Sequence, residues 1–326
     1  MARGDRRGSL DRPWAGSGAR APGRKDVAPQ FMTPAVSVFD DKGRLDIEQN
    51  QRLYEHLICG GVSGLVILGS IGEFCGMDMA TSMKAIDIAT GYARGRLRLF
   101  AGASRMDPAE SVTLANYAAD RGVDGVMIVS PYYFRLGDDA IYDYYRFIAS
   151  RVAANIFLYN FPDRTGYSLS PAVALRLARD FPNIRGLKDT VPDVAHTAEV
   201  IRTVTPEVPY FEVFSGFDNN FAHNILSGGA GCIGGLSNIV PGVCAAWMAA
   251  LAAGDLAATA RYQRIIDRLM AVYAIGDPFI PIVKKALVLL GVIRSDVCTR
   301  PMLPAGEAET VRLRAVLEAA DLCLSR

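Results

Sequence analysis

The chain has 326 residues, of which 50% are hydrophobic, so it can bury a sizeable core. Its formal net charge of +1 gives no electrostatic reason to expect nucleic acid or an anionic membrane as a partner. No apolar run approaches the roughly 20 residues that a membrane helix needs. Six scattered cysteines without a C-x-x-C pair indicate free thiols in a reducing cytoplasm, and three distant histidines show no metal-ligand spacing. We therefore expect a cytoplasmic protein without a metal site or cofactor.

The first 28 residues differ from the rest of the chain. They are rich in Arg, Gly, Ala, Pro and Ser and contain few large apolar residues. A transit peptide would form an amphipathic helix, which Asp5, Asp11 and the scattered Gly and Pro oppose. We interpret residues 1–28 as a disordered tail or as the result of a start codon assigned too early.

From Gln30 onward, short apolar runs alternate with longer helical stretches. Amphipathic character predicts a helix over 46–59, and the start signals Asp-Pro and Ser-Pro predict helices over 107–121 and 170–180. Apolar runs bounded by Gly, Pro or Asn, with helices between them, are typical of parallel strands covered by helices. The predicted strands are 35–39, 64–69, 97–102, 123–130, 155–160, 184–188, 211–215 and 230–234.

About eight strand–helix units are present, which is the number that closes a (β/α)8 TIM barrel. The alternative is a doubly wound open sheet, but no G-x-G-x-x-G follows the first strand and the strand count is long for that fold. From residue 241 the pattern is purely helical, over 241–253, 255–272, 278–290 and 307–324. We predict one catalytic barrel over 29–240 with a C-terminal helical extension over 241–326.

In such a barrel, functional residues lie at the carboxyl ends of the strands. Lys188 ends a short apolar strand, where a buried ammonium is costly unless it is paired. One interpretation is a lysine paired with the neighbouring Asp189. The other is an amine whose pKa is lowered by desolvation, so that it can attack a carbonyl carbon.

Three more side chains stand at neighbouring strand ends. Tyr159 could relay protons, or it could be a core aromatic whose hydroxyl bonds a backbone carbonyl. Tyr133, in a Pro-Tyr-Tyr turn, could be a surface or interface aromatic. Ser70 could serve turn geometry, although the backbone N–H groups of its Gly-rich loop could hold a carboxylate. The placement of all these residues at successive strand ends favours an active site.

Five motifs, in this order and spacing, carry a family resemblance: GSIGEF (69–74), SPYY (130–133), LYNFPDRTG (158–166), GLKDT (186–190) and GGAGCIGG (228–235). Over residues 31–303 the chain resembles the dihydrodipicolinate synthase / N-acetylneuraminate lyase family of class I aldolases. The resemblance implies that Lys188 forms a Schiff base and that Tyr159 relays protons. It implies that Ser70 lies beside that phenol and the keto-acid carboxylate. Tyr133 matches a tyrosine that homotetramers of the family commonly insert into a neighbouring subunit's site.

The resemblance also implies residues that bind substrate. Gly72 shapes the carboxylate loop, and Gly216 and Ile233 line the pocket. Ile71 departs from the family pattern, which usually has a second hydroxyl residue there, so the backbone amides and Ser70 are left to hold the carboxylate. This departure weakens the match to the standard synthase reaction.

Other positions bear on the second substrate. Arg164 matches the arginine that binds the second substrate's carboxylate in dihydrodipicolinate synthases, a task that suits a guanidinium. Asp218 stands where sugar-acid lyases place polar groups for hydroxyls, and Thr190 is a further candidate for that role. The run from LYNFP to GLKDTVPDVAH most resembles the 2-keto-3-deoxy sugar-acid aldolase branch.

The first hypothesis is therefore a reversible aldolase that cleaves a 2-keto-3-deoxy sugar acid to pyruvate and an aldehyde. The second is a 4-hydroxy-tetrahydrodipicolinate synthase that condenses pyruvate with aspartate semialdehyde. The third is a dehydratase that uses the same imine to expel a hydroxyl group. The fourth, an inactive scaffold, is disfavoured because a decayed site has no physical reason to keep a costly buried lysine.

Overall fold

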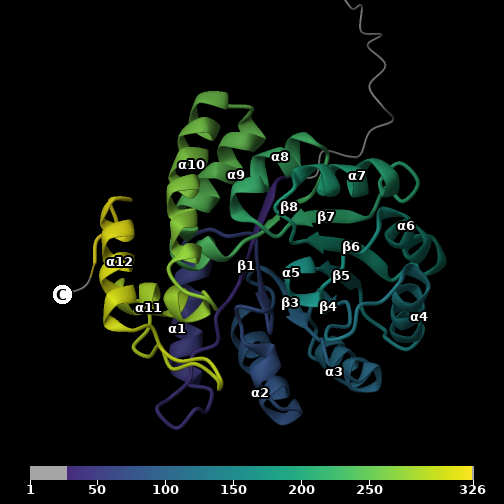
Figure 1. The fold of residues 1–326 in the computed structure, drawn as a ribbon, viewed down its shortest axis with the longest axis horizontal. Coiled ribbons are helices and arrows are strands. Elements are labelled where there is room, and N and C mark those ends of the chain that lie inside the picture. Colours follow the sequence, from purple (N-terminus) through teal and green to yellow (C-terminus); the bar gives the residue numbers. More distant parts are fainter. Residues whose placement is uncertain (1–27, 325–326) are drawn as a thin grey trace, which may run out of the picture.

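The computed structural model describes residues 28–324. Eight parallel strands close into a barrel in the order of the sequence, and helices cover its outside (Figure 1). The predicted TIM barrel with C-terminal helices is confirmed. The interpretation of the N-terminal tail concerns residues that, apart from Ala28, lie outside the described part of the chain. None of the helices within residues 28–324 is long and apolar enough to cross a lipid bilayer.

The strands are β1 Gln30–Pro34, β2 Gly64–Ile67, β3 Arg98–Gly102, β4 Gly125–Val129, β5 Ile156–Asn160, β6 Ile184–Asp189, β7 Glu212–Ser215 and β8 Gly231–Ile233. The helices around them are α1 Ile47–Cys59, α2 Met79–Ala93, α3 Pro108–Asp120, α4 Asp138–Ala149, α5 Pro162–Thr165, α6 Pro171–Asp180, α7 Val194–Val204 and α8 Phe221–Leu226. The later helices are α9 Pro241–Ala253, α10 Leu256–Leu269, α11 Ile280–Leu289 and α12 Glu307–Glu318. The 3-10 turns within residues 28–324 are η1 Phe74–Gly76, η2 Asp218–Asn220, η3 Gly235–Asn238 and η4 Met270–Ala274.

The first strand lies at Gln30–Pro34, so its predicted position at 35–39 was wrong. Both runs are short, apolar and buried, and such runs cannot be told apart by periodicity. Hydrogen-bonded pairing with the neighbouring strands distinguishes the two runs, because Met32 of the first run stands in register with Gly64 of β2 and Ile233 of β8. The Met32 side chain occupies the space that a Cβ at Gly64 would need, 2.6 Å from its Cε.

Side chains alternate along each strand between the barrel interior and the helices. The interior is filled by a cluster that includes Met32, Val66, Phe100, Phe157 and Phe214, with Tyr159 and Ile233 in the same cluster. The residues that alternate with them belong to a larger core between the barrel and its helices. The polar side chains at the carboxyl ends of the strands are therefore supported by a tightly packed barrel interior.

The C-terminal helices complete one side of the molecule. α9 contacts β1 and α10, and α11 contacts α12 and the 3-10 turns η3 and η4. In Figure 1 the helices α10, α11 and α12 lie on one side of the barrel, and α12 contacts both α10 and α11. The segment between η4 and α11 thereby reaches the carboxyl end of the barrel, where it contributes to the cavity described next.

Candidate active site

A cavity of about 240 Å³ opens at the carboxyl ends of the strands. Eight of the residues predicted from sequence line it: Ser70, Ile71, Tyr159, Arg164, Lys188, Thr190, Gly216 and Ile233. The remaining lining residues are Pro34, Phe161, Asp163, Phe217, Tyr273, Gly276, Asp277 and Phe279. Tyr133, Gly72 and Asp218 do not line the cavity.

Lys188 lies near the end of β6 and is 5% exposed. Its Nζ lies 4.6 Å from the centroid of the Tyr159 ring. Among residues 28–324, no group forms a hydrogen bond or ion pair with this ammonium. An amine that is buried, unpaired and open to a cavity is suited to attack a carbonyl carbon.

Asp189 does not pair with Lys188, because adjacent residues of a strand point to opposite faces. Its carboxylate accepts hydrogen bonds from Asn160 Nδ2 at 2.8 Å and from Thr197 Oγ1 at 2.6 Å. The Nδ1 of His196 lies 2.9 Å from the same carboxylate, and this contact raises the pKa of His196. The end of β6 is thus fastened to β5 and α7, which holds the backbone of Lys188 in place.

Tyr159 and Ser70 form a hydroxyl pair beside the amine. The hydroxyl oxygen of Tyr159 lies 3.3 Å from Ser70 Oγ, and its ring stacks on Phe161 with the centroids 5.9 Å apart. The phenol of this buried tyrosine therefore bonds a side chain in the cavity and not a backbone carbonyl. This arrangement provides a route for a proton between a substrate near Lys188 and the Ser70 loop.

Two left-handed residues bracket the Ser70 loop, Leu68 with φ 53° and Glu73 with φ 63°. Residues other than glycine seldom adopt this conformation, and it persists only where the surroundings enforce it. Gly102 makes room for the first bend, since a Cβ there would lie 1.9 Å from the Leu68 carbonyl oxygen. Gly72 belongs to the same loop and does not line the cavity, and its carbonyl accepts a hydrogen bond of 2.8 Å from Ser37 Oγ.

Thr190 and Gly216 face each other at the wall formed by β6 and β7. Thr190 Oγ1 is buried and has no hydrogen-bond partner within the described residues. A Cβ at Gly216 would lie 1.9 Å from that oxygen, so only glycine leaves it in place. A buried hydroxyl without a partner is costly, and a ligand in the cavity could satisfy it.

Asp218 does not line the cavity, but it bonds Tyr273, which does. Its Oδ2 accepts a hydrogen bond of 2.8 Å from the Tyr273 hydroxyl, and its Oδ1 accepts one of 2.9 Å from the Leu236 N–H. Burial raises the pKa of Asp218 to about 6. Tyr273 was missed in the sequence because it lies in a helical stretch far from the strand ends. The Gly276-Asp277-Pro278 break that follows was the available signal of a loop there.

Arg164 stands at the open rim of the cavity, where its side chain is half exposed. Its guanidinium lies 3.9 Å from Asp277 and over the ring of Phe161. A second cavity of about 390 Å³ adjoins the first, and Ser70, Phe161 and Arg164 line both. The second cavity extends toward residues 299–302.

Tyr133 stands on the surface with 85% of its area exposed and with φ 95°. Its ring packs edge-on against Phe134, which is also exposed, with the centroids 4.9 Å apart. Within residues 28–324, no group of three or more His, Cys, Asp or Glu side chains is arranged to hold a metal ion.

Comparison with known proteins places this geometry in a family. Residues 28–320 match the family described as the Dihydrodipicolinate synthetase family. The Escherichia coli K12 protein "Probable 2-dehydro-3-deoxy-D-pentonate aldolase YjhH" is 35% identical over 289 residues, 89% of this chain and 96% of that protein. The 4-hydroxy-tetrahydrodipicolinate synthase of Nitratidesulfovibrio vulgaris strain DP4 is 32% identical over 292 residues, 89% of this chain and 98% of that enzyme.

A solved structure shows the same similarity. YagE of E. coli K12, whose curated name is "Putative 2-dehydro-3-deoxy-D-gluconate aldolase YagE", is known as a complex with pyruvate. That structure aligns with a TM-score of 0.88 and 31% identity, and the match covers 90% of this chain and 99% of YagE. The chain therefore belongs to the dihydrodipicolinate synthetase family and is a lyase of the class I aldolase type.

Proposed function

We propose that this enzyme reversibly cleaves a 2-keto-3-deoxy sugar acid to pyruvate and an aldehyde through a Schiff base on Lys188. The observation that carries the proposal is the buried Lys188 amine, which has no partner within the described chain and lies 4.6 Å from the Tyr159 ring in the cavity. Two hydroxyl groups, those of Tyr159 and Ser70, lie next to each other in the same cavity.

The reaction follows from these positions. The Lys188 amine attacks C2 of the keto acid, and loss of water from the carbinolamine gives the iminium. Tyr159 takes the proton of the C4 hydroxyl, in contact with Ser70, while the C3–C4 bond breaks. The bonding electrons move into the iminium to form an enamine, and C4 leaves as the aldehyde. Protonation at C3 and hydrolysis then release pyruvate and the free amine.

Two features favour a polyhydroxylated substrate. The Thr190 hydroxyl has no partner in the described structure, and the Tyr273 hydroxyl is oriented by Asp218 at the edge of the cavity. Both can bond substrate hydroxyls. Ile71 adds an apolar wall where a further donor would otherwise stand. The names of YjhH and YagE refer to aldolases of 2-keto-3-deoxy sugar acids, which agrees with this choice.

The second candidate is a 4-hydroxy-tetrahydrodipicolinate synthase, and Arg164 is the observation that favours it. A guanidinium at the rim could bind the carboxylate of aspartate semialdehyde. Against this, Asp277 already lies 3.9 Å from that guanidinium and would compete for it.

Borohydride trapping tests the Schiff base. The protein is incubated with pyruvate, reduced and digested, and the modified peptide is located by mass spectrometry. We expect the adduct on Lys188 and none in Lys188→Ala. Lys284 is also fully buried but lies outside the cavity, so its peptide is an internal control that should stay unmodified. An unmodified Lys188 with pyruvate and with longer keto acids would refute the proposal.

Product identification separates the candidate reactions. The aldolase releases an aldehyde and pyruvate from a 2-keto-3-deoxy pentonate or gluconate. A dehydratase acting on the same acids breaks no carbon–carbon bond and therefore releases no pyruvate. A synthase consumes pyruvate only when aspartate semialdehyde is added. Condensation with the semialdehyde, without cleavage of any sugar acid, would establish the second candidate in place of the first.

We further propose that the enzyme assembles as a homotetramer and that Tyr133 serves a neighbouring subunit's site. The exposed pair of Tyr133 and Phe134 presents an aromatic surface that an interface could cover. Native mass measurement, repeated with Tyr133→Ala, tests this proposal. A monomeric wild-type protein would contradict it.

A further inference from the structure

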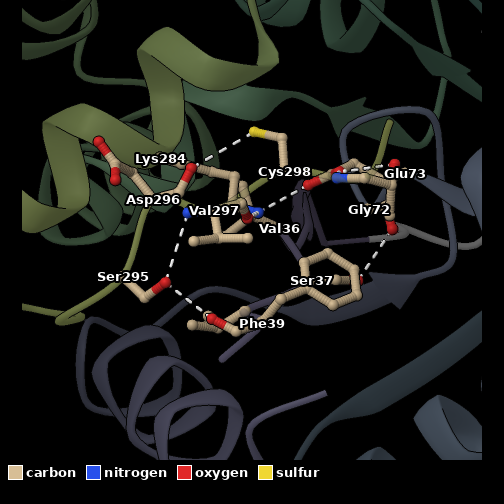
Figure 2. A network of polar contacts seen from close by, with 12 residues as sticks. Val36, Ser37, Phe39, Gly72, Glu73, Lys284, Ser295, Asp296, Val297 and Cys298 are labelled. Atoms are coloured by element: carbon tan, nitrogen blue, oxygen red, sulfur yellow. Dashed lines mark hydrogen bonds and ion pairs between the residues drawn. The ribbon is translucent and has the colours of Figure 1, made fainter. Parts of the chain in front are cut away.

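A fully buried ion pair joins Glu73, the last residue of the Ser70 loop, to Lys284 of α11 (Figure 2). Glu73 and Lys284 are 211 residues apart, both are 0% exposed, and Lys284 Nζ lies 2.7 Å from Glu73 Oε1. The other carboxylate oxygen accepts hydrogen bonds from Thr299 N at 2.6 Å and from Thr299 Oγ1 at 2.9 Å. The ammonium also donates to the Val297 carbonyl and lies 4.7 Å from the centroid of the Phe39 ring. Each charge therefore has several partners, as buried charges require.

One end of the pair determines the shape of the loop. Glu73 is the left-handed residue with which the loop ends, and its N–H donates to the Ser70 carbonyl at 3.1 Å. Ser70 and Ile71, within the same turn, line the cavity. The contacts of the Glu73 side chain thus enforce a backbone conformation on which the position of the Ser70 hydroxyl depends.

The other end holds a second part of the lining. Lys284 lies on α11, and the residues just before this helix, Asp277 and Phe279, line the same cavity as the loop. The segment after α11 is held as well, because Ser295 Oγ donates 2.7 Å to the Phe39 carbonyl. The ion pair therefore joins two walls of one cavity that come from distant parts of the chain.

A purely stabilising role accounts poorly for this choice of residues. Replacing a buried ion pair by apolar side chains of similar volume often leaves a protein equally stable. An ion pair differs from an apolar contact because its hydrogen bonds fix distances and directions. That property matters where the spacing of two walls determines how a small acid fits.

We propose that Glu73 and Lys284 are positioning residues. They set the distance between the Ser70 loop and the C-terminal wall, and through it the affinity for the carboxylate of the keto acid. The helical extension is then part of the active site, although Lys284 touches no substrate. The affinity part of this inference rests on the proposed Schiff-base function, whereas the part that concerns the loop does not.

The test uses the full-length protein with the double variant Glu73→Gln/Lys284→Met, which leaves no unpaired charge, and with the milder Thr299→Val. Lys285→Met is the matched control, since Lys285 pairs with Asp296 at 2.5 Å on the same helix and segment. Trapping is measured against pyruvate concentration. We expect both test variants to raise the half-saturating concentration, the double variant by roughly ten- to a hundredfold. At saturation, the same fraction of Lys188 should be labelled as in the control.

Hydrogen exchange of the peptide that covers residues 69–76 gives a readout without substrate. The double variant should lose protection in this peptide, while Lys285→Met keeps it. A double variant with wild-type loop protection and wild-type half-saturation would overturn the positioning role, as would a lower melting temperature as its only change. If wild type traps no keto acid, the Schiff-base proposal fails, and loop exchange alone then decides the inference: lost protection supports it, and unchanged protection overturns it.

Discussion

The buried carboxyl of Asp218 makes a quantitative prediction about stability and pH. Its pKa of about 6 lies above its ordinary value of 3.8 because the group is desolvated. The native state therefore binds this proton more tightly than the unfolded state. The resulting stabilisation is complete below pH 3.8 and is lost as the pH rises through about 6. The difference between the pKa of about 6 and the ordinary value of 3.8 corresponds to about 3 kcal/mol of unfolding free energy.

Asp218→Asn removes this titration and keeps the shape of the side chain. The amide oxygen can still accept from the Leu236 N–H, and the amide nitrogen can donate to the Tyr273 hydroxyl. Between pH 4 and pH 7, the unfolding free energy of wild type should fall by up to about 3 kcal/mol relative to that of the variant. In melting temperature this is a relative loss of roughly 6 °C.

Thermal unfolding of both proteins, followed by tryptophan fluorescence in steps from pH 4 to pH 8, measures this difference. Titrating groups that do not interact with Asp218 contribute equally to both proteins and cancel. The exposed Asp41 provides a control, since Asp41→Asn should run parallel to wild type over the whole range. A constant difference in melting temperature between wild type and Asp218→Asn would refute the reasoning that burial raises this pKa.

Three further substitutions test the cavity. Tyr159→Phe keeps the ring beside Lys188 but removes the phenol hydroxyl. Aldehyde release from the sugar acid should slow by about 10²- to 10⁴-fold, while pyruvate trapping persists. An unchanged rate of aldehyde release would exclude the phenol as proton carrier. Thr190→Val removes a hydroxyl that has no partner in the described chain. Loss of one hydrogen bond of about 1 kcal/mol to the substrate should raise KM for the sugar acid about fivefold and leave pyruvate trapping unchanged. Equal KM values in variant and wild type would remove Thr190 from the substrate site. Gly102→Ala places a Cβ 1.9 Å from the Leu68 carbonyl and should lower the unfolding free energy by about 1–3 kcal/mol in urea titrations, and trapping should weaken as well. Wild-type stability in that variant would mean that the loop can move aside.

Much of the site could be predicted from local rules. Apolar runs bounded by turn residues, and the rule that function lies at the carboxyl ends of barrel strands, were sufficient to bring Ser70, Tyr159 and Lys188 together, and all three line one cavity. Thr190, which the family resemblance added, lines the same cavity. The opposite directions of Lys188 and Asp189 also follow from strand geometry, although the sequence left open whether the two side chains pair.

What the sequence by itself determined is therefore the barrel and most of its strands with the residues at their ends, because these follow from local apolar runs bounded by turn residues. Pairing over long distances was decided only by the tertiary structure. The position of β1 depends on Gly64 and Ile233, and the orientation of Asp218 depends on Tyr273. Glu73 meets Lys284 across 211 residues. No local pattern encodes such contacts, since they arise only when the closed barrel brings the C-terminal helices against the ends of its strands.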